Sequence, residues 1–203
     1  MKENQLEDYY AYLKQLTTKV DTFFEQQRPY VCCKEGCSYC CEKGQYPCSE
    51  LEFSFLELGY LNLDEEIKSK IKDKVAILAK LKKNNPEEVL ECECPFLINK
   101  KCSVYAYRPI ICRTFGIPFF DDSGKLKVPF CNELGLNYSQ VYDRTRNILS
   151  EELFKKTGFS QEPLAYNLSL KFLISKVGKE GMKLDFGQQR TIVDWMIDFV
   201  KQD

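Results

Sequence analysis

Eleven cysteines and no histidine constrain this 203-residue chain more than any other feature. Without histidine, a metal site must use thiolates, supplemented only by carboxylates or backbone groups. Cys–His and Ser–His nucleophilic catalysis are impossible within the chain. The odd number of cysteines would leave one thiol over if all the others formed disulfides. A chain of this length can also bury a core without covalent cross-links, so the cysteines favour metal ligation over disulfide or redox chemistry.

The surroundings expected for this chain are cytoplasmic. Its first residues have neither the apolar stretch nor the cleavage site of a secretory signal, and no apolar run reaches the length of a membrane helix. In the cytoplasm, cysteine clusters are more often metal ligands or redox groups than disulfides. The net charge of -1 argues against nucleic acid as the main partner. We therefore expect metal ions as partners and no membrane or nucleic acid, while a protein partner or substrate stays open.

Hydrophobic periodicity and capping signals predict helices on both sides of a cysteine-rich middle. Ser49 and Glu52 fit a capping box, and Asn62 and Glu65 suit the start of a long helix. A helical turn begins near Pro109. The expected elements are helices at 4–27, 49–59, 62–84, 137–158, 160–178 and from 185, and hairpins at 95–105 and 115–130.

The fold class expected from these elements is mainly α with small β-hairpins, an irregular α+β arrangement. A helical scaffold would surround a cysteine-ligated metal core. We see no linker and expect a single domain over residues 1–203. Its cysteine-cluster core would span 30–131, between helical flanks at 1–29 and 137–203.

The spacing of eight cysteines is typical of metal ligands. They form two runs, Cys33-x3-Cys37-x2-Cys40-Cys41 and Cys94-x7-Cys102-x9-Cys112-x18-Cys131. A two-residue gap lets two thiolates face one metal, and Gly36 allows the backbone bend. Side chains of adjacent residues should diverge, so Cys40 and Cys41 would serve different metals, or only one would be a ligand. Eight thiolates could complete two four-ligand sites, but the grouping stays open.

Other residues near these runs have weaker assignments. Arg108 and Arg113 flank Cys112 and could donate N–H groups to the sulfurs around a metal, or they could be ordinary surface residues. Three cysteines lie outside the pattern, namely Cys32, Cys48 and Cys92. Zinc and iron cannot be separated by ligand type, because thiolates suit both.

These motifs resemble the YkgJ-type cysteine-cluster proteins, a family described as a zinc- or iron-chelating domain. The resemblance covers about residues 33–131. It rests on the first cysteine run, Cys94-Pro95-Phe96-Leu97, Cys102-Ser103-Val104-Tyr105, and Arg108-Pro109-x2-Cys112-Arg113-Thr114-Phe115. The metal ligands it implies are Cys33, Cys37, Cys40, Cys41, Cys94, Cys102, Cys112 and Cys131.

Three functions are compatible with the pattern. The leading hypothesis is a metal-binding protein with one or two thiolate centres that hold zinc, iron or a four-iron cluster. The second is an iron–sulfur enzyme, because the flagellin lysine methylases have a similar cysteine motif; Tyr105, Arg108 and Arg113 would be its candidate participants. The third is a thiol redox protein that uses Cys37 and Cys40.

Overall fold

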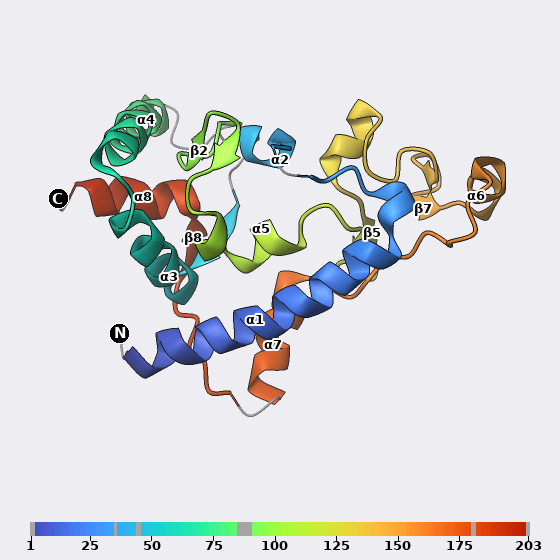
Figure 1. Cartoon of the computed structure of the whole chain (residues 1–203), viewed down its shortest axis with the longest axis horizontal. Helices are drawn as coiled ribbons and strands as arrows, with labels where there is room; N and C mark the ends of the chain where they lie inside the picture. The colour runs from blue at the N-terminus through green and yellow to red at the C-terminus, as the bar shows by residue number, and fades with distance from the viewer. Residues whose placement is uncertain (1–2, 35, 44–45, 85–90, 180–181, 202–203) are drawn as a thin grey trace. The chain divides into compact units, whose positions relative to one another are not determined.

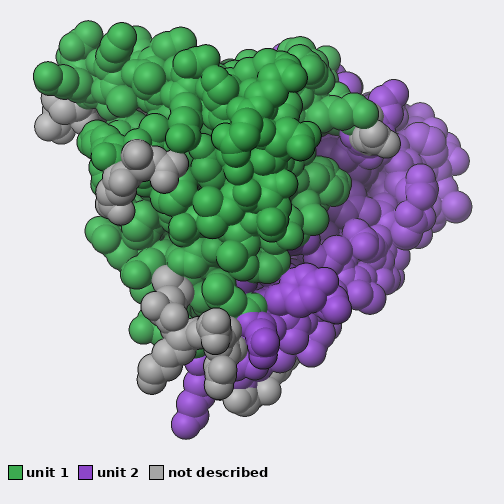
Figure 2. Space-filling model, turned by 60° about the vertical axis from the view of Figure 1, so that its left-hand side comes forward, with its two compact units in different colours: residues 1–6, 35–112, 185–203 green, residues 7–34, 113–184 purple. Residues whose placement is uncertain are grey.

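The computed structural model describes residues 3–34, 36–43, 46–84, 91–179 and 182–201 (Figure 1). The chain divides into two compact units (Figure 2). Unit 1 comprises residues 1–6, 35–112 and 185–203, and unit 2 comprises residues 7–34 and 113–184. The described elements are helices and two-stranded antiparallel sheets, which confirms the predicted mainly α class with small hairpins. No helix in the described part of the chain is long and apolar enough to cross a membrane.

The core of unit 1 is built from three helices, α3 (Glu50–Leu61), α4 (Glu65–Asn84) and α8 (Ile192–Val200). On α4, Ile71, Val75 and Leu78 recur at three- and four-residue steps and are buried, as the sequence pattern predicts. They belong to one hydrophobic cluster with the buried face of α8. Strands β1 (Pro47–Ser49) and β8 (Gln189–Thr191) pair antiparallel beside this core.

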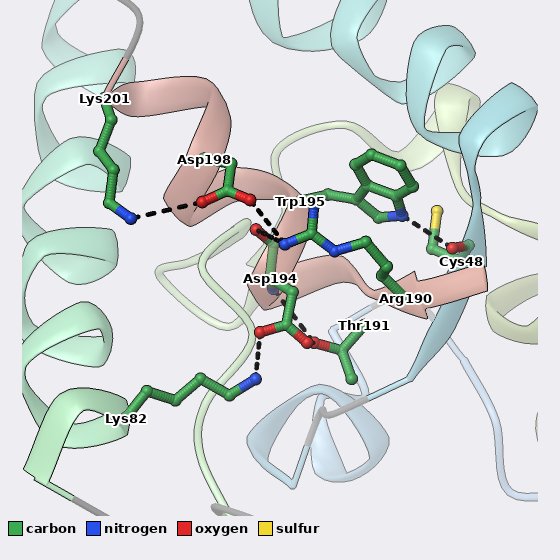
Figure 3. A network of polar contacts seen from close by, with 8 residues as sticks. All are labelled: Cys48, Lys82, Arg190, Thr191, Asp194, Trp195, Asp198 and Lys201. Carbon is green, nitrogen blue, oxygen red and sulfur yellow. Dashed lines mark hydrogen bonds and ion pairs between the residues drawn. The ribbon is translucent and has the colours of Figure 1, made fainter. Parts of the chain in front are cut away.

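A polar network on the outside of this core joins α4, β8 and α8 (Figure 3). Asp194 accepts hydrogen bonds from Lys82 and from the Thr191 hydroxyl, and Asp198 accepts one from Arg190 at 2.7 Å. Trp195 Nε1 donates to the backbone oxygen of Cys48 at 2.8 Å, which ties α8 to β1. These bonds hold the C-terminal helix against the segment that precedes α3.

The cysteine-bearing part of unit 1 consists of short elements. They are α2 (Tyr39–Glu42), β2 (Leu97–Ile98), β3 (Lys101–Cys102), the 3-10 helix η2 (Tyr105–Tyr107) and the start of α5 (Ile110–Thr114). Strands β2 and β3 form the hairpin predicted at 95–105. Asn99 and Lys100 both have positive φ, as a two-residue turn between twisted strands requires.

Unit 2 holds most of α1 (Glu3–Gln26), which the apolar period predicts, followed by η1 (Arg28–Tyr30). Its sheets are β4 (Phe119–Phe120) with β5 (Leu126–Lys127), and β6 (Tyr142–Asp143) with β7 (Ile148–Leu149). Its other helices are η3 (Phe130–Leu134), α6 (Glu151–Thr157) and α7 (Leu170–Lys179). A small cluster of Tyr30, Tyr138 and Val141 is buried within it.

Three predicted boundaries in unit 1 are wrong. The α3 helix continues past Gly59 to Leu61, and Asn62 is its C-cap rather than the N-cap of α4. The last helix begins at Ile192 instead of residue 185. The last helix begins late because the residues before it make tertiary contacts. The backbone oxygens of Phe186 and Gln188 accept the first N–H groups of α3, and β8 pairs with β1.

The predicted helix at 137–158 is also wrong, since that stretch holds the β6–β7 hairpin and the short helix α6. Asn137 does not cap a helix, because its side chain bonds to other parts of unit 2. Only the end of the prediction survives, at Gly158 with a φ of +71°. The helix predicted at 160–178 begins at Leu170, after an extended stretch whose Tyr166 bridges to Phe119.

Candidate metal centre

The sequence runs around Cys40 and Cys94 meet in unit 1. The N–H of Cys94 donates to the backbone oxygen of Cys41 at 2.7 Å. The hydroxyl of Tyr46 donates to the backbone oxygen of Cys40, also at 2.7 Å, and so fastens the end of α2. Neither contact is visible in the sequence, and Tyr46 is a residue that the sequence analysis missed.

The adjacent thiols on α2 face each other. The Sγ atoms of Cys40 and Cys41 lie 3.9 Å apart. The expectation that their side chains diverge is therefore wrong; rotation about χ1 lets the sulfurs of neighbouring residues approach. This thiol–thiol contact, together with burial, raises the pKa of Cys40 far above the ordinary thiol value.

The thiols of Cys102 and Cys112 interact electrostatically with that of Cys40, and the thiol of Cys94 interacts with those two. Burial raises the pKa of Cys112, and the thiols of Cys102 and Cys40 raise it further. Burial and the Cys112 thiol raise the pKa of Cys94 in the same way. We name these five residues the thiol cluster: Cys40, Cys41, Cys94, Cys102 and Cys112. Because thiolates repel one another, a bound cation would stabilise the ionised form of the cluster.

A buried carboxyl group binds the backbone of the helix that carries Cys112. Glu52 is 1% exposed, and its Oε1 accepts the N–H of Ile110 at 2.9 Å, at the start of the helix that carries Cys112. Its Oε2 accepts from the N–H and the hydroxyl of Ser49, at 2.8 and 2.7 Å. The predicted capping box is thus confirmed. The link to Ile110 had no sequence signal, since it joins residues 58 positions apart.

The surroundings of Glu52 disfavour the ionised form of its carboxyl group. Burial raises its pKa, against the hydrogen bonds from Ser49 and Ile110. The carboxyl group also raises the pKa of the buried Cys48 thiol, after burial itself.

Arg108 acts electrostatically on two thiols of the cluster. It lowers the pKa of Cys102 and Cys112, against the larger effect of burial. Its Nε donates to the backbone oxygen of Tyr105 at 3.0 Å, and its guanidinium lies 3.5 Å from the centre of that ring. Arg113 belongs to unit 2, where it donates to the Thr17 hydroxyl at 3.1 Å.

The other predicted ligands are divided between the two units. Cys37 belongs to unit 1, whereas Cys33 and Cys131 belong to unit 2. Cys33 Sγ accepts a hydrogen bond from Asn137 Nδ2 at 3.1 Å, and Cys131 is 7% exposed within η3. Asn137 was predicted only as a helix cap, and its bond to a thiol is new.

The cluster is not a closed metal site as it stands. Among the residues described, no three histidine, cysteine, aspartate or glutamate side chains lie close enough together to hold an ion. Its donors do fit a thiophilic metal, since all five are thiols and one pair of sulfurs is already close. Searches of family models, of curated proteins and of solved structures find no match to this chain.

Proposed function

We propose that this chain is a cytoplasmic metal-binding protein whose thiol cluster in unit 1 holds zinc or iron. The observation that carries the proposal is the meeting of two cysteine-bearing stretches, 40–41 and 94–112. The Cys94 N–H bonds to the Cys41 oxygen, and the sulfurs of Cys40 and Cys41 lie 3.9 Å apart. Ionised thiols that lie this close repel one another, so a bound cation would stabilise them. The resemblance to the YkgJ-type family points to the same chemistry.

Binding would couple metal to folding. Thiolates that are held together by a cation stabilise the folded chain, and the bound ion releases the thiol protons. The positive charge of Arg108 would offset part of the negative charge on the Cys102 and Cys112 thiolates. Changes of χ1 at these cysteines would bring the sulfurs to the ion.

Elemental analysis of protein purified without oxygen tests the proposal. We expect zinc or iron in the wild type and its loss from the double variant Cys40→Ser, Cys112→Ser. The control is Cys32→Ser, which removes an exposed thiol outside the cluster. Equal metal contents in all three proteins, or none in any, would contradict the proposal. A brown protein that contains iron and sulfide would instead favour the iron–sulfur enzyme related to the flagellin methylases.

A further inference from the structure

A surface hollow of about 430 Å³ lies in unit 1, and the charged residues of Figure 3 line part of it. We name it the basic groove. Its apolar lining consists of Ala79 on α4 and Ile197 on α8, which belong to the hydrophobic core or pack against it. Its charged lining consists of five cations and two carboxylates: Lys80, Lys82, Lys83, Arg190, Lys201, Asp194 and Asp198. The groove therefore has a net charge of +3, in a chain whose net charge is -1.

The cations of the groove come from three places in the fold. Three lysines lie near the end of α4, Arg190 lies in β8, and Lys201 follows the last residue of α8. Lysines at the ends of helices are favoured by the helix dipole. The dipole does not account for Arg190, nor for the convergence of all these cations on one hollow.

Positive charge remains in the groove after its internal ion pairs are formed. Its two carboxylates pair with three of the cations, Asp194 with Lys82, and Asp198 with Arg190 and Lys201. Lys80 and Lys83 are exposed and form no ion pair or hydrogen bond with any residue in the described ranges. They are three positions apart on α4, so they are neighbours on the helix surface. These two lysines are available to an anionic ligand.

The groove suits carboxylates better than phosphates. Bidentate recognition of phosphate requires an arginine, and Arg190 is already engaged. Its guanidinium donates to Asp198 at 2.7 Å and to the backbone oxygen of Asp194 at 3.3 Å, and it lies 4.7 Å from the centre of the Trp195 ring. The Asp198 side chain is 45% exposed in the groove and would repel a continuous phosphate backbone. Lysines are compact point charges that can bind single carboxylates.

We propose that the basic groove binds an acidic peptide segment of a partner protein. Carboxylates of the peptide contact Lys80 and Lys83, and an apolar side chain packs against Ala79 and Ile197. Binding depends on salt, because the ion pairs are exposed and are screened by added ions. The inference is independent of the thiol cluster, whose cysteines do not line the groove.

Fluorescence anisotropy of the full chain with a fluorescein-labelled peptide of glutamates around a central leucine tests the proposal. We expect saturable binding that weakens as salt is added. One exposed ion pair contributes up to about 5-fold in affinity, and an introduced carboxylate also repels the probe. The double variant Lys80→Glu, Lys83→Glu should therefore bind at least about 10-fold more weakly.

The matched control is Lys155→Glu, Lys156→Glu in the last turn of α6, in unit 2. It changes the net charge of the chain by the same amount and should bind the peptide as the wild type does. Asp198→Asn should act in the opposite direction. It removes a carboxylate from the groove and should tighten binding by up to about 5-fold.

NMR of the wild type gives a reading that does not depend on variants folding. On addition of the peptide, the amide signals of Ala79, Lys83 and Ile197 should shift, and that of Tyr138 in unit 2 should not.

Four outcomes would overturn the inference. They are no binding of the peptide at low salt, equal weakening in the two double variants, amide shifts confined to residues outside the groove, and tighter binding of a single-stranded oligonucleotide of the same charge. The last outcome would identify a nucleic-acid surface instead. None of them changes the expected metal content, so the proposed function is tested separately.

Discussion

The chain contains two pairs of adjacent cysteines, and the two units treat them differently. In unit 1, the sulfurs of Cys40 and Cys41 face each other at 3.9 Å. In unit 2, the backbone N–H of Cys32 donates to Asn137 Oδ1 at 2.8 Å, and Asn137 Nδ2 donates to Cys33 Sγ at 3.1 Å. One pair meets other thiols, and the other meets a buried amide.

The two pairs of cysteines therefore have different requirements for stability. An amide satisfies its neighbours with directed hydrogen bonds and requires no ion. A group of thiols has only weak donors and acceptors, and its members repel when they ionise. Unit 1 should therefore depend on a cation, whereas unit 2 should not.

Metal removal should have the largest effect on stability, and it should destabilise unit 1 but not unit 2. If free metal exceeds its Kd a thousandfold, binding stabilises the fold by about 4 kcal/mol. For a chain of this size that corresponds to roughly 8–16 °C in melting temperature. We expect a strong chelator to lower the melting temperature of the metal-loaded protein by such an amount, as measured by calorimetry.

Amide hydrogen exchange locates that effect. The Cys94 N–H, bonded to Cys41 in unit 1, should gain protection when zinc is added. The Tyr138 N–H, bonded to Tyr30 in unit 2, is the control and should not change. Equal gains at both amides would contradict the contrast between the units.

The variant Glu52→Gln tests the hydrogen bonds that the buried carboxyl group accepts from Ser49 and Ile110. A glutamine has one oxygen where the carboxyl group has two, so either Ser49 or Ile110 loses its acceptor. A buried N–H left without a partner costs about 1–3 kcal/mol. We expect a loss of that size at pH 5 in urea unfolding of the metal-free protein. The control is Glu66→Gln, whose side chain is 78% exposed in its pair with Lys70 and whose loss should change little.

The pH dependence of this variant has a definite sign. Because burial raises the pKa of Glu52 in the folded state, the favourable contribution of its neutral form is complete below the ordinary glutamate pKa. That contribution is lost as the pH rises through the raised value. The stability gap between wild type and Glu52→Gln should therefore narrow as the pH rises from the ordinary glutamate pKa to the raised value, and should stay constant above it. A gap that widens with pH would show that the carboxylate is stabilised in place rather than strained.

How much the sequence could predict depends on the range of the interactions. The helix α1, the capping box of Ser49 and Glu52, and the turn at Asn99 and Lys100 depend on neighbours within a few residues, and all were predictable. The pairing of β1 with β8 joins three-residue strands that are far apart in the sequence, at 47–49 and 189–191, so no local pattern predicts it.

The candidate site divides in the same way. The cysteine types and spacings indicated metal chemistry, but not which sulfurs would meet. Cys40 and Cys41 were expected to diverge because adjacent residues usually do, and rotamers set by tertiary contacts decided otherwise. Asn137 bonds to residues 21, 104 and 105 positions away, which no local pattern can indicate. The bond from Tyr46 to Cys40 spans six positions and follows neither the helix nor the strand period.

Asn137→Ala tests the amide that binds the adjacent cysteines of unit 2. It removes the acceptor of the Cys32 N–H and the donors to Cys33 Sγ and to the Gly116 oxygen. Because Asn137 is 1% exposed, water cannot replace all of these partners, and we expect a loss of about 2 kcal/mol in urea unfolding. Asn62→Ala, at the exposed end of α3, should cost about 0.5 kcal/mol or less. Metal content should match the wild type, and a loss of metal would show that the thiol cluster depends on Asn137.

The smallest effect concerns a carboxylate of unit 2 that behaves oppositely to Glu52. Asp121 Oδ1 accepts from the Ser123 hydroxyl at 2.6 Å and from the N–H groups of Ser123 and Lys125. These bonds, led by the hydroxyl, lower the pKa of Asp121 to about 2. Its stabilising effect is thus present above the ordinary aspartate pKa and is lost as the pH falls through about 2.

Carboxyl chemical shifts followed by NMR from pH 6 to pH 1.5 would measure this pKa. Ser123→Ala removes the leading hydrogen bond and should move the midpoint of Asp121 upward, toward the ordinary aspartate value. The Glu52 midpoint in the same spectra should stay above the ordinary glutamate value, because Ser123 and Asp121 belong to the other unit. If the Asp121 midpoint is unchanged in Ser123→Ala, the two N–H donors alone hold the carboxylate. The contrast between the units would then rest on backbone rather than side-chain partners.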